Sequence, residues 1–262
     1  MKNAQAFSSQ ISDLLVMVER NLLRYVRLPQ LLVFSTIQPI MFLLLFTYVF
    51  GGAILTQYAS YIDFLLPGIL VQSVLFGALQ TGAGLVEDLN KGLVDRFRSL
   101  PMARGAVLGG RTLADMMRNI FVILLMISVG YMIGFRAHEG FWNALTAFTL
   151  LLYLGFAFSW VSAAIGMLTR TVEAAQVAGF IWVFPLVFTS SIFVPVNTMP
   201  DWLQFFARIN PVTVTADSIR MLLLGAPDGA ELASKFIAAF VWIALLLVVF
   251  VPIAIRLYRR SS

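Results

Sequence analysis

Six apolar runs, each about twenty residues long or longer, limit the fold of this chain more than any other feature of its sequence. A helix needs roughly 20 apolar residues to cross about 30 Å of hydrocarbon. In this chain 60% of the residues are hydrophobic and only 12% are charged, which exceeds what a soluble core of 262 residues can bury. The sequence therefore predicts an all-α polytopic membrane protein with six transmembrane helices, at about 31–50, 61–86, 113–135, 141–168, 174–194 and 232–255.

Lysine and arginine are distributed unequally between the two sides of these predicted spans. One side carries Lys2, Arg20, Arg24, Arg27, Lys91, Arg96, Arg98, Arg104, Arg111, Arg118, Arg170, Arg256, Arg259 and Arg260. The other side carries Arg136, Arg208, Arg220 and Lys235. Because basic residues concentrate in cytoplasmic loops, both termini and the 87–111 connection are predicted to be cytoplasmic. An even number of spans agrees with this placement.

Residues 1–30 form a unit of their own ahead of the six-span domain at 31–262. Apolar side chains recur there at helical spacing, and charged side chains occupy the opposite side. The apolar set is Ile11, Leu14, Leu15, Val18, Leu22 and Val26, and the charged set is Asp13, Arg20, Arg24 and Arg27. The pattern predicts an amphipathic helix in the membrane interface, ended by Pro29. It serves either as a topology anchor alone or as an elbow helix that also contacts a cytoplasmic partner.

A charged, patterned segment at 87–101 follows the second predicted span. Its apolar side chains recur on one helical face and its charged side chains on another, and Pro101 ends the helix. The apolar set is Leu89, Leu93, Phe97 and Leu100, and the charged set is Glu87, Lys91, Asp95 and Arg98. Charge pairs at this spacing contribute only about 0.2–0.5 kcal/mol each, so such a helix needs a surface to pack on. The alternative is a solvated loop helix that only maintains orientation.

The region 195–231, between the fifth and sixth predicted spans, is moderately apolar and contains four prolines. Pro195, Pro200, Pro211 and Pro227 divide it into short helices. We expect these helices to lie at the external surface or to enter the membrane re-entrantly.

Several uncharged side chains within the spans are candidates for a substrate pathway. Gln38 and Gln72 are intramembrane polar groups that need partners, and interhelical hydrogen bonding would also explain them. Phe180, Phe184 and Phe188 form a stripe at i, i+4 and i+8, for which lipid contact or plain packing is the alternative. The candidate pathway set is Gln38, Phe42, Gln72, Phe180, Phe184 and Phe188.

Two acid–arginine pairs at i, i+3 spacing stand at the ends of predicted helices. Asp115 and Arg118 occur where the third span leaves the cytoplasmic side, and Asp217 and Arg220 precede the last span. Both are interpreted as local pairs that orient their helices.

Four segments of the chain resemble the type 2 permeases of ATP-binding-cassette exporters, among them the daunorubicin and doxorubicin resistance permeases. They are GLVEDLNKGLVDRFRSLPMARGAVLGGRTLADMMRN, QPIMFLLLFTYVFGG, LPGILVQ and NPVTVTADSIR. The resemblance covers nearly the whole chain. It implies a bacterial cytoplasmic (inner) membrane subunit that pairs with a second copy and with two copies of a cytoplasmic ATPase, which would hold ATP and magnesium. It also implies that 87–101 is the coupling helix, with contacts from Glu87, Asp88, Leu89, Lys91, Leu93, Asp95, Arg96, Phe97, Arg98 and Pro101.

Other classes of function lack the residues that they require. No glycine-rich phosphate loop ending in Gly-Lys-Ser or Gly-Lys-Thr occurs, so ATP hydrolysis is assigned to a partner. With no cysteine and only His138, the chain is not expected to hold a metal or a cofactor, or to be a membrane-embedded enzyme. A secondary transporter would carry ionisable groups at mid-depth, and these spans carry almost none. The predicted function is export of a hydrophobic or amphiphilic drug-like or lipid-like substrate, with a polysaccharide or glycolipid as the alternative cargo.

Overall fold

Helices joined by turns and loops make up the residues that the computed structural model describes, which are 2–27, 29–91 and 104–260, and these ranges contain no strand. In chain order the helices are α1 (Lys2–Arg27), α2 (Pro29–Leu45), α3 (Tyr61–Asn90), α5 (Arg104–Met132), α6 (Phe141–Leu168), α7 (Val172–Phe188), α8 (Asp201–Ile209), α9 (Pro211–Leu224) and α10 (Gly229–Arg260). A π-helical turn, Phe46–Phe50, extends α2, and a 3₁₀ turn, Val196–Thr198, precedes α8.

Local sequence signals set several of the helix ends. The Ser60 side chain caps α3 by accepting a hydrogen bond from the backbone N–H of Asp63 at 3.4 Å. The Thr171 hydroxyl caps α7 in the same way, accepting from Ala174 at 3.1 Å. At α9, Asn210 accepts from Val212 at 2.9 Å and proline fills the first helical position. The helix ends before Gly225, whose φ of +98° is open to glycine at little cost.

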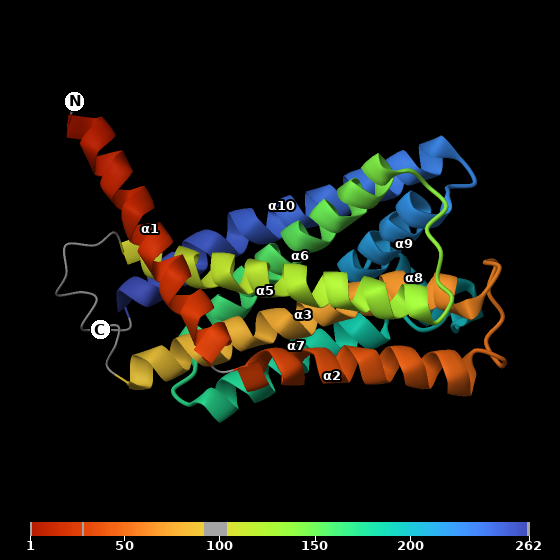
Figure 1. Cartoon of the computed structure of the whole chain (residues 1–262), viewed down its shortest axis with the longest axis horizontal. Helices are drawn as coiled ribbons and strands as arrows, with labels where there is room; N and C mark the ends of the chain where they lie inside the picture. The colour runs from red at the N-terminus through yellow and green to blue at the C-terminus, as the bar shows by residue number, and fades with distance from the viewer. Residues whose placement is uncertain (1, 28, 92–103, 261–262) are drawn as a thin grey trace.

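Helix α3 runs through the centre of the bundle, with α5, α6, α7 and α9 packed around it (Figure 1). Its most extensive contact is with α6, and glycines allow the two backbones to touch. A Cβ on Gly166 would lie 2.6 Å from the Gly82 carbonyl oxygen, and a Cβ on Gly82 would lie 2.4 Å from the Ser162 carbonyl oxygen. Helices inside a membrane gain nothing from the hydrophobic effect when they associate, because lipid tails are as apolar as the helices. They associate instead by close packing, which small residues allow.

Four helices are long and apolar enough to cross a membrane, judged by length and composition over the described residues. They are Tyr61–Asn90, Leu108–Met132, Phe141–Leu168 and Gly229–Tyr258. The first and fifth predicted spans appear as the shorter apolar helices Ser35–Phe50 and Val172–Phe188. Helix α7 has 17 residues, or roughly 25 Å, against about 30 Å of hydrocarbon. The chain turns at Thr189 rather than continuing to Val194 as the apolar pattern predicted, with Pro185 in the last turn of α7.

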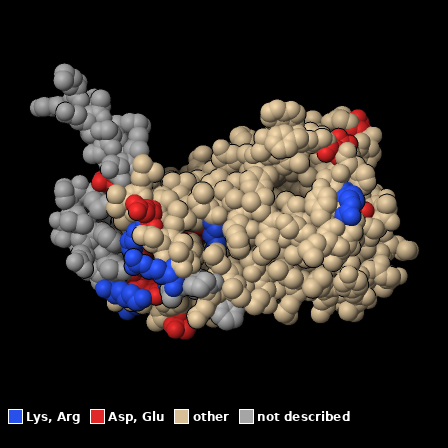
Figure 2. All heavy atoms as spheres, viewed as in Figure 1, with Lys and Arg blue, Asp and Glu red and all other residues tan. Residues whose placement is uncertain are grey.

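Charged side chains collect at the two ends of the bundle, and its middle is uncharged on the face in Figure 2. The richer end holds α1, the end of α3, the beginning of α5 and the end of α10 (Figures 1 and 2). This separation is the one expected of a chain whose middle contacts hydrocarbon.

At the opposite end, a buried arginine joins α9 to α3 and to the turn after α7. Arg220 is 1% exposed and donates to the carbonyl oxygens of Phe64 at 2.7 Å and Ser191 at 2.6 Å. It also pairs with Asp217 at 2.9 Å, as the i, i+3 spacing predicted, and Lys235 of α10 lies 3.2 Å from the same carboxylate. The guanidinium is also 3.9 Å from the centroid of the Phe64 ring. Because its donors are used within the protein, this cluster is structural.

Candidate functional site: a polar cavity at the charged end

Helix α1 is attached to the bundle by ion pairs at the charged end. Arg24 bonds to Glu87, and Arg20 lies 3.3 Å from Asp88, so two arginines of α1 meet the last turns of α3. Burial lowers the pKa of Arg24, but its hydrogen bond with Glu87 and the charge of that carboxylate outweigh burial and leave the pKa above its ordinary value. Lys91 also pairs with Glu87, at 2.6 Å, which confirms the i, i+4 pair expected from the sequence.

Asp115 of α5 is a fully buried carboxylate shared by three helices. Tyr25 of α1 and Thr81 of α3 both donate hydrogen bonds to it. Arg111 and Arg118 each approach it only to 3.9 Å. The predicted pairing of Asp115 with Arg118 is therefore present, but the closer partners come from other helices. Burial, and then the charge of Asp115, raise the pKa of Tyr25 to about 12, so its hydroxyl remains a donor.

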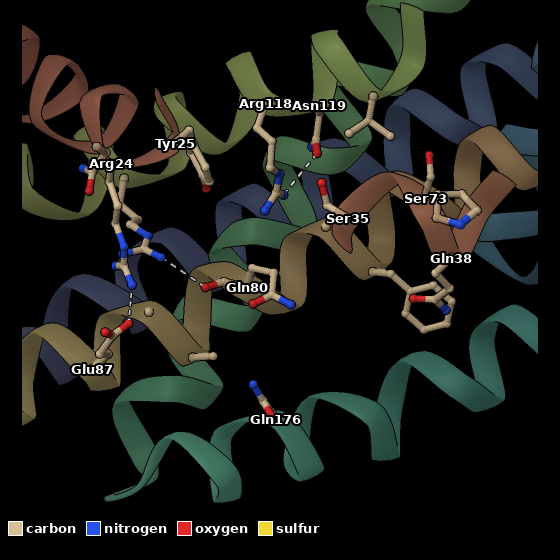
Figure 3. A pocket seen from close by; sticks show the side chains of 18 of the residues that line it. Arg24, Tyr25, Ser35, Gln38, Ser73, Gln80, Glu87, Arg118, Asn119 and Gln176 are labelled. Atoms are coloured by element: carbon tan, nitrogen blue, oxygen red, sulfur yellow. Dashed lines mark hydrogen bonds and ion pairs between the residues drawn. The ribbon is translucent and has the colours of Figure 1, made fainter. Parts of the chain in front are cut away.

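A cavity of about 260 Å³ lies among α1, α2, α3, α5 and α7 beside these ion pairs (Figure 3). One face of α3 forms its longest wall, because the lining residues Gln72, Ser73, Phe76, Gly77, Gln80, Ala83, Gly84 and Glu87 follow helical spacing. Glu87 follows Gln72 by fifteen positions, a rise of about 22 Å along the helix. The cavity therefore reaches from the charged end far into the bundle.

Two glycines of this face make room for arginines that come from α5. A Cβ on Gly77 would lie 2.7 Å from Arg118 Nη2, and one on Gly84 would lie 1.7 Å from Arg111 Nη2. Arg118 is 3% exposed, makes one hydrogen bond, to Asn119 Oδ1 at 3.2 Å, and has no partner for its Nε. In Figure 3 Arg118 from α5 and Gln176 from α7 point into the same space.

A row of phenylalanine rings leads away from the cavity between α7 and α2. Phe76 lines the cavity, and its ring centroid lies 6.2 Å from that of Phe180 and 5.9 Å from that of Phe184. The row, called the aromatic row below, continues through contacts of 4.5–6.1 Å between centroids and consists of Phe76, Phe180, Phe184, Phe188, Phe193, Phe46 and Phe42. Phe180, Phe184 and Phe188 remain 40–49% exposed on α7.

The structure brings the six candidate pathway residues into one region. Gln38 and Gln72 line the cavity, and the other four, Phe42, Phe180, Phe184 and Phe188, belong to the aromatic row. Of the candidate coupling residues, Glu87, Asp88 and Leu89 stand in the last turns of α3, and Lys91 follows directly. The predicted coupling helix thus begins inside α3. Leu93, Asp95, Arg96, Phe97, Arg98 and Pro101 lie outside the described residues.

Sequence reasoning missed the wall of the cavity. Gly77, Gln80, Gly84 and Asn119 were not singled out, and Arg118 was assigned only an orienting role. The sequence pattern that could have predicted this wall is the helical spacing of Gln72, Gly77, Gln80 and Gly84. It places polar and small residues on one face of an otherwise apolar span.

Comparison with known proteins identifies the family of the chain. The model of the ABC-2 type transporter family matches residues 12–224. The daunorubicin resistance ABC transporter permease protein DrrB1 of Streptomyces coeruleorubidus is 34% identical over 98% of this chain and 89% of its own length. A probable doxorubicin resistance permease, DrrC, of Mycobacterium tuberculosis is 26% identical over 96% of this chain and 90% of its own. The putative transport permease ycf38 of Cyanophora paradoxa is 27% identical over 81% of this chain and 74% of its own. The chain therefore belongs to the ABC-2 type transporter family, as a membrane transport subunit with ATP hydrolysis on a separate subunit.

Proposed function

We propose that this permease exports a hydrophobic or amphiphilic, drug-like or lipid-like substrate from the cytoplasm, driven by ATP hydrolysis on its partner. One observation carries the proposal: a polar cavity at the charged end is joined through Phe76 to the aromatic row on α7 and α2. A polar entrance followed by aromatic surface suits a molecule with a polar part and an apolar body. The resistance phenotypes in the names of the two Drr relatives support the same class of cargo.

The proposal includes a six-span topology with both termini in the cytoplasm. The basic residues of α1 and of the beginning of α5, with Lys91 directly after α3, lie together at one end of the bundle (Figure 2), which supports assigning that end to the cytoplasm. On this topology α8 and α9 form the external re-entrant region. The membrane is the bacterial cytoplasmic membrane.

The proposal also includes the partners. Two ATPase subunits, which hold ATP and magnesium, dock on the segment 87–101 of two copies of this chain. Support comes from the ion pairs of Glu87 and Asp88 with α1, because a force on the segment after α3 would reach α1 and α3 together. Exposed apolar side chains on α2 and α7, such as Met41 and Ile181, offer surface for the second copy.

Export is tested in cells that express the chain with its ATPase. We expect these cells to accumulate less of a fluorescent amphiphilic dye than cells whose ATPase carries a substitution in its phosphate-loop lysine. Phe97→Ala should remove an apolar anchor of about 1–3 kcal/mol from ATPase docking, so co-purification with the ATPase and export should both fall. Ala230, exposed at the other end, supplies the control variant Ala230→Ser. Equal dye accumulation with active and inactive ATPase, across apolar and amphiphilic dyes, would contradict the proposed function.

A further inference from the structure

The described part of the cavity wall holds more positive than negative charge. Arg24, Arg111 and Arg118 line the cavity together with one carboxylate, Glu87. Asp88 and Asp115 lie next to it, but their oxygens already receive contacts from α1 and α3 as well as from these arginines. Because buried charge needs a partner of opposite sign, the described wall is suited to an additional anion.

Three residues that line this space each carry a polar atom that has no partner among the described residues. Arg118 Nε, Asn119 Nδ2 and Gln72 Oε1 have no hydrogen-bond partner, and each belongs to a cavity-lining residue that is 2–3% exposed. Buried polar groups without partners are rare in folded proteins and call for an explanation such as a ligand. Arg118 Nε is a donor, which again suits an acceptor of hydrogen bonds, whereas Asn119 Nδ2 lies on the side of Gly155 in α6, where an added Cβ would be 2.8 Å away.

The remaining wall is apolar and leads to the aromatic row. Pro39, Val122 and Val172 line the cavity with Phe76, whose ring contacts Phe180 and Phe184. A volume of about 260 Å³ is slightly below the roughly 300–1,000 Å³ of sites that enclose a drug-sized ligand. It therefore holds a head group and the first part of an apolar body, whose remainder would extend along the aromatic row.

We propose that each copy of this chain binds one anionic amphiphile, with its acidic head on Arg118 and its apolar body against Phe76 and the aromatic row. The head is a carboxylate or a phosphate monoanion, which guanidinium donors recognise through charge-assisted hydrogen bonds. The molecule comes either from the membrane, as an acidic lipid, or from the cytoplasm, as cargo. Its role as cargo rests on the proposed function, whereas binding itself does not.

The test uses the full-length chain purified with its ATPase, without ATP, and dansyl-labelled undecanoic acid as the probe. We expect the acid to bind at least about tenfold more tightly than its methyl ester, because the ester has the same body but no charge. Arg118→Gln should abolish this preference, and Arg118→Lys should restore part of it. Arg136→Gln, at an exposed arginine bonded only to nearby carbonyl oxygens, is the matched control and should keep the preference.

A second variant tests the site independently, because Arg118→Gln leaves Asp115 with one cation fewer and could fail to fold. Gly77→Ala keeps every charge and places a methyl group 2.7 Å from Arg118 Nη2, so the flexible end of that side chain must move. We expect it to weaken acid binding at least about tenfold. Gly140→Ala, whose added Cβ meets nothing within 4 Å, should bind like the parent.

Two competitors distinguish the sources of the ligand. Displacement of the probe by dihexanoyl phosphatidylglycerol, with the same lipid co-purifying with the parent but not with Arg118→Gln, assigns the membrane as the source. ATP-dependent export of the acid without such displacement assigns cargo. Displacement by millimolar inorganic phosphate alone would overturn an amphiphile site, as would equal affinities for acid and ester or unchanged binding in both Arg118→Gln and Gly77→Ala. Binding as expected, together with equal dye accumulation in cells with active and with inactive ATPase, would contradict the proposed function and leave this site standing.

Discussion

At the scale of single residues, three arginines of this bundle differ in their burial and in how their donors are paired. Arg220 has its donors occupied by Phe64, Ser191, Ile192 and Asp217, and so it joins three segments permanently. Arg24 bridges two helices through Glu87 and remains partly exposed. Arg118 is buried with its Nε unpaired, which is the observation behind the anion site proposed above.

The structural role of Arg220 predicts a large loss of stability when it is replaced. Arg220→Met removes the donors of three buried carbonyl oxygens and one partner of Asp217, which keeps Lys235. We expect the free energy of unfolding in mixed detergent micelles to fall by about 3 kcal/mol. Arg208→Met, at an exposed arginine bonded only to Gln204, should stay within about 0.5 kcal/mol of the parent. A similar small effect for Arg220→Met would show that the cluster adds little to stability.

At the scale of elements, α1 lies against α5 across a contact that leaves little room for side chains. A Cβ on Gly110 of α5 would lie 2.4 Å from Met17 Cβ and 3.1 Å from the Met17 carbonyl carbon. A Cβ on the neighbouring Gly109 would meet only the tip of the Leu14 side chain, at 3.0 Å. The two glycines are adjacent in sequence, yet only one of them faces backbone.

This difference predicts opposite outcomes for two neighbouring substitutions. Gly110→Val should push α1 away from α5 at a cost of about 1–3 kcal/mol, whereas Gly109→Val should be tolerated because Leu14 can change rotamer. The measurement is maleimide labelling of Met17→Cys, which is 2% exposed in the parent and should react slowly. We expect faster labelling with Gly110→Val only. Equal rates in the two variants would mean that α1 is not fixed by this contact.

Some helices could be predicted from the sequence and others only in part, for physical reasons that differ along the chain. The apolar runs at 61–86, 141–168 and 232–255 correspond to α3, α6 and α10 because hydrophobicity alone determines which residues leave water. Helix α5 begins at Arg104, nine residues before the predicted span, and its polar Arg111 finds partners on α3, the Gln80 carbonyl oxygen and the Asp88 carboxylate, that no local pattern reveals. The pathway candidates were found as single polar or aromatic residues, but the cavity depends on four other helices meeting one face of α3.

At the scale of the whole molecule, the separation of charge between the two ends predicts the orientation in the membrane. Asp201, at the beginning of α8, and Asn90, at the end of α3, are both exposed and lie toward opposite ends of the chain's long axis. The chain contains no cysteine, so the labelling of a single introduced cysteine shows on which side of the membrane that residue lies. Asp201→Cys should react with an impermeant maleimide in intact cells, and Asn90→Cys should react only after permeabilisation. The reverse pattern would contradict a cytoplasmic charged end.

The backbone contact between α3 and α6 has a consequence for experiments on how this transporter moves. Helices that touch through Gly82 and Gly166 cannot slide past one another without a bulkier residue meeting a carbonyl group. Spin labels or fluorophores placed on exposed positions of these two helices should therefore keep a constant separation throughout the ATP cycle. Such a pair would be a fixed reference. Changes in the distance from a label on α3 or α6 to a label on α1, α2 or α7 can then be assigned to movement of α1, α2 or α7.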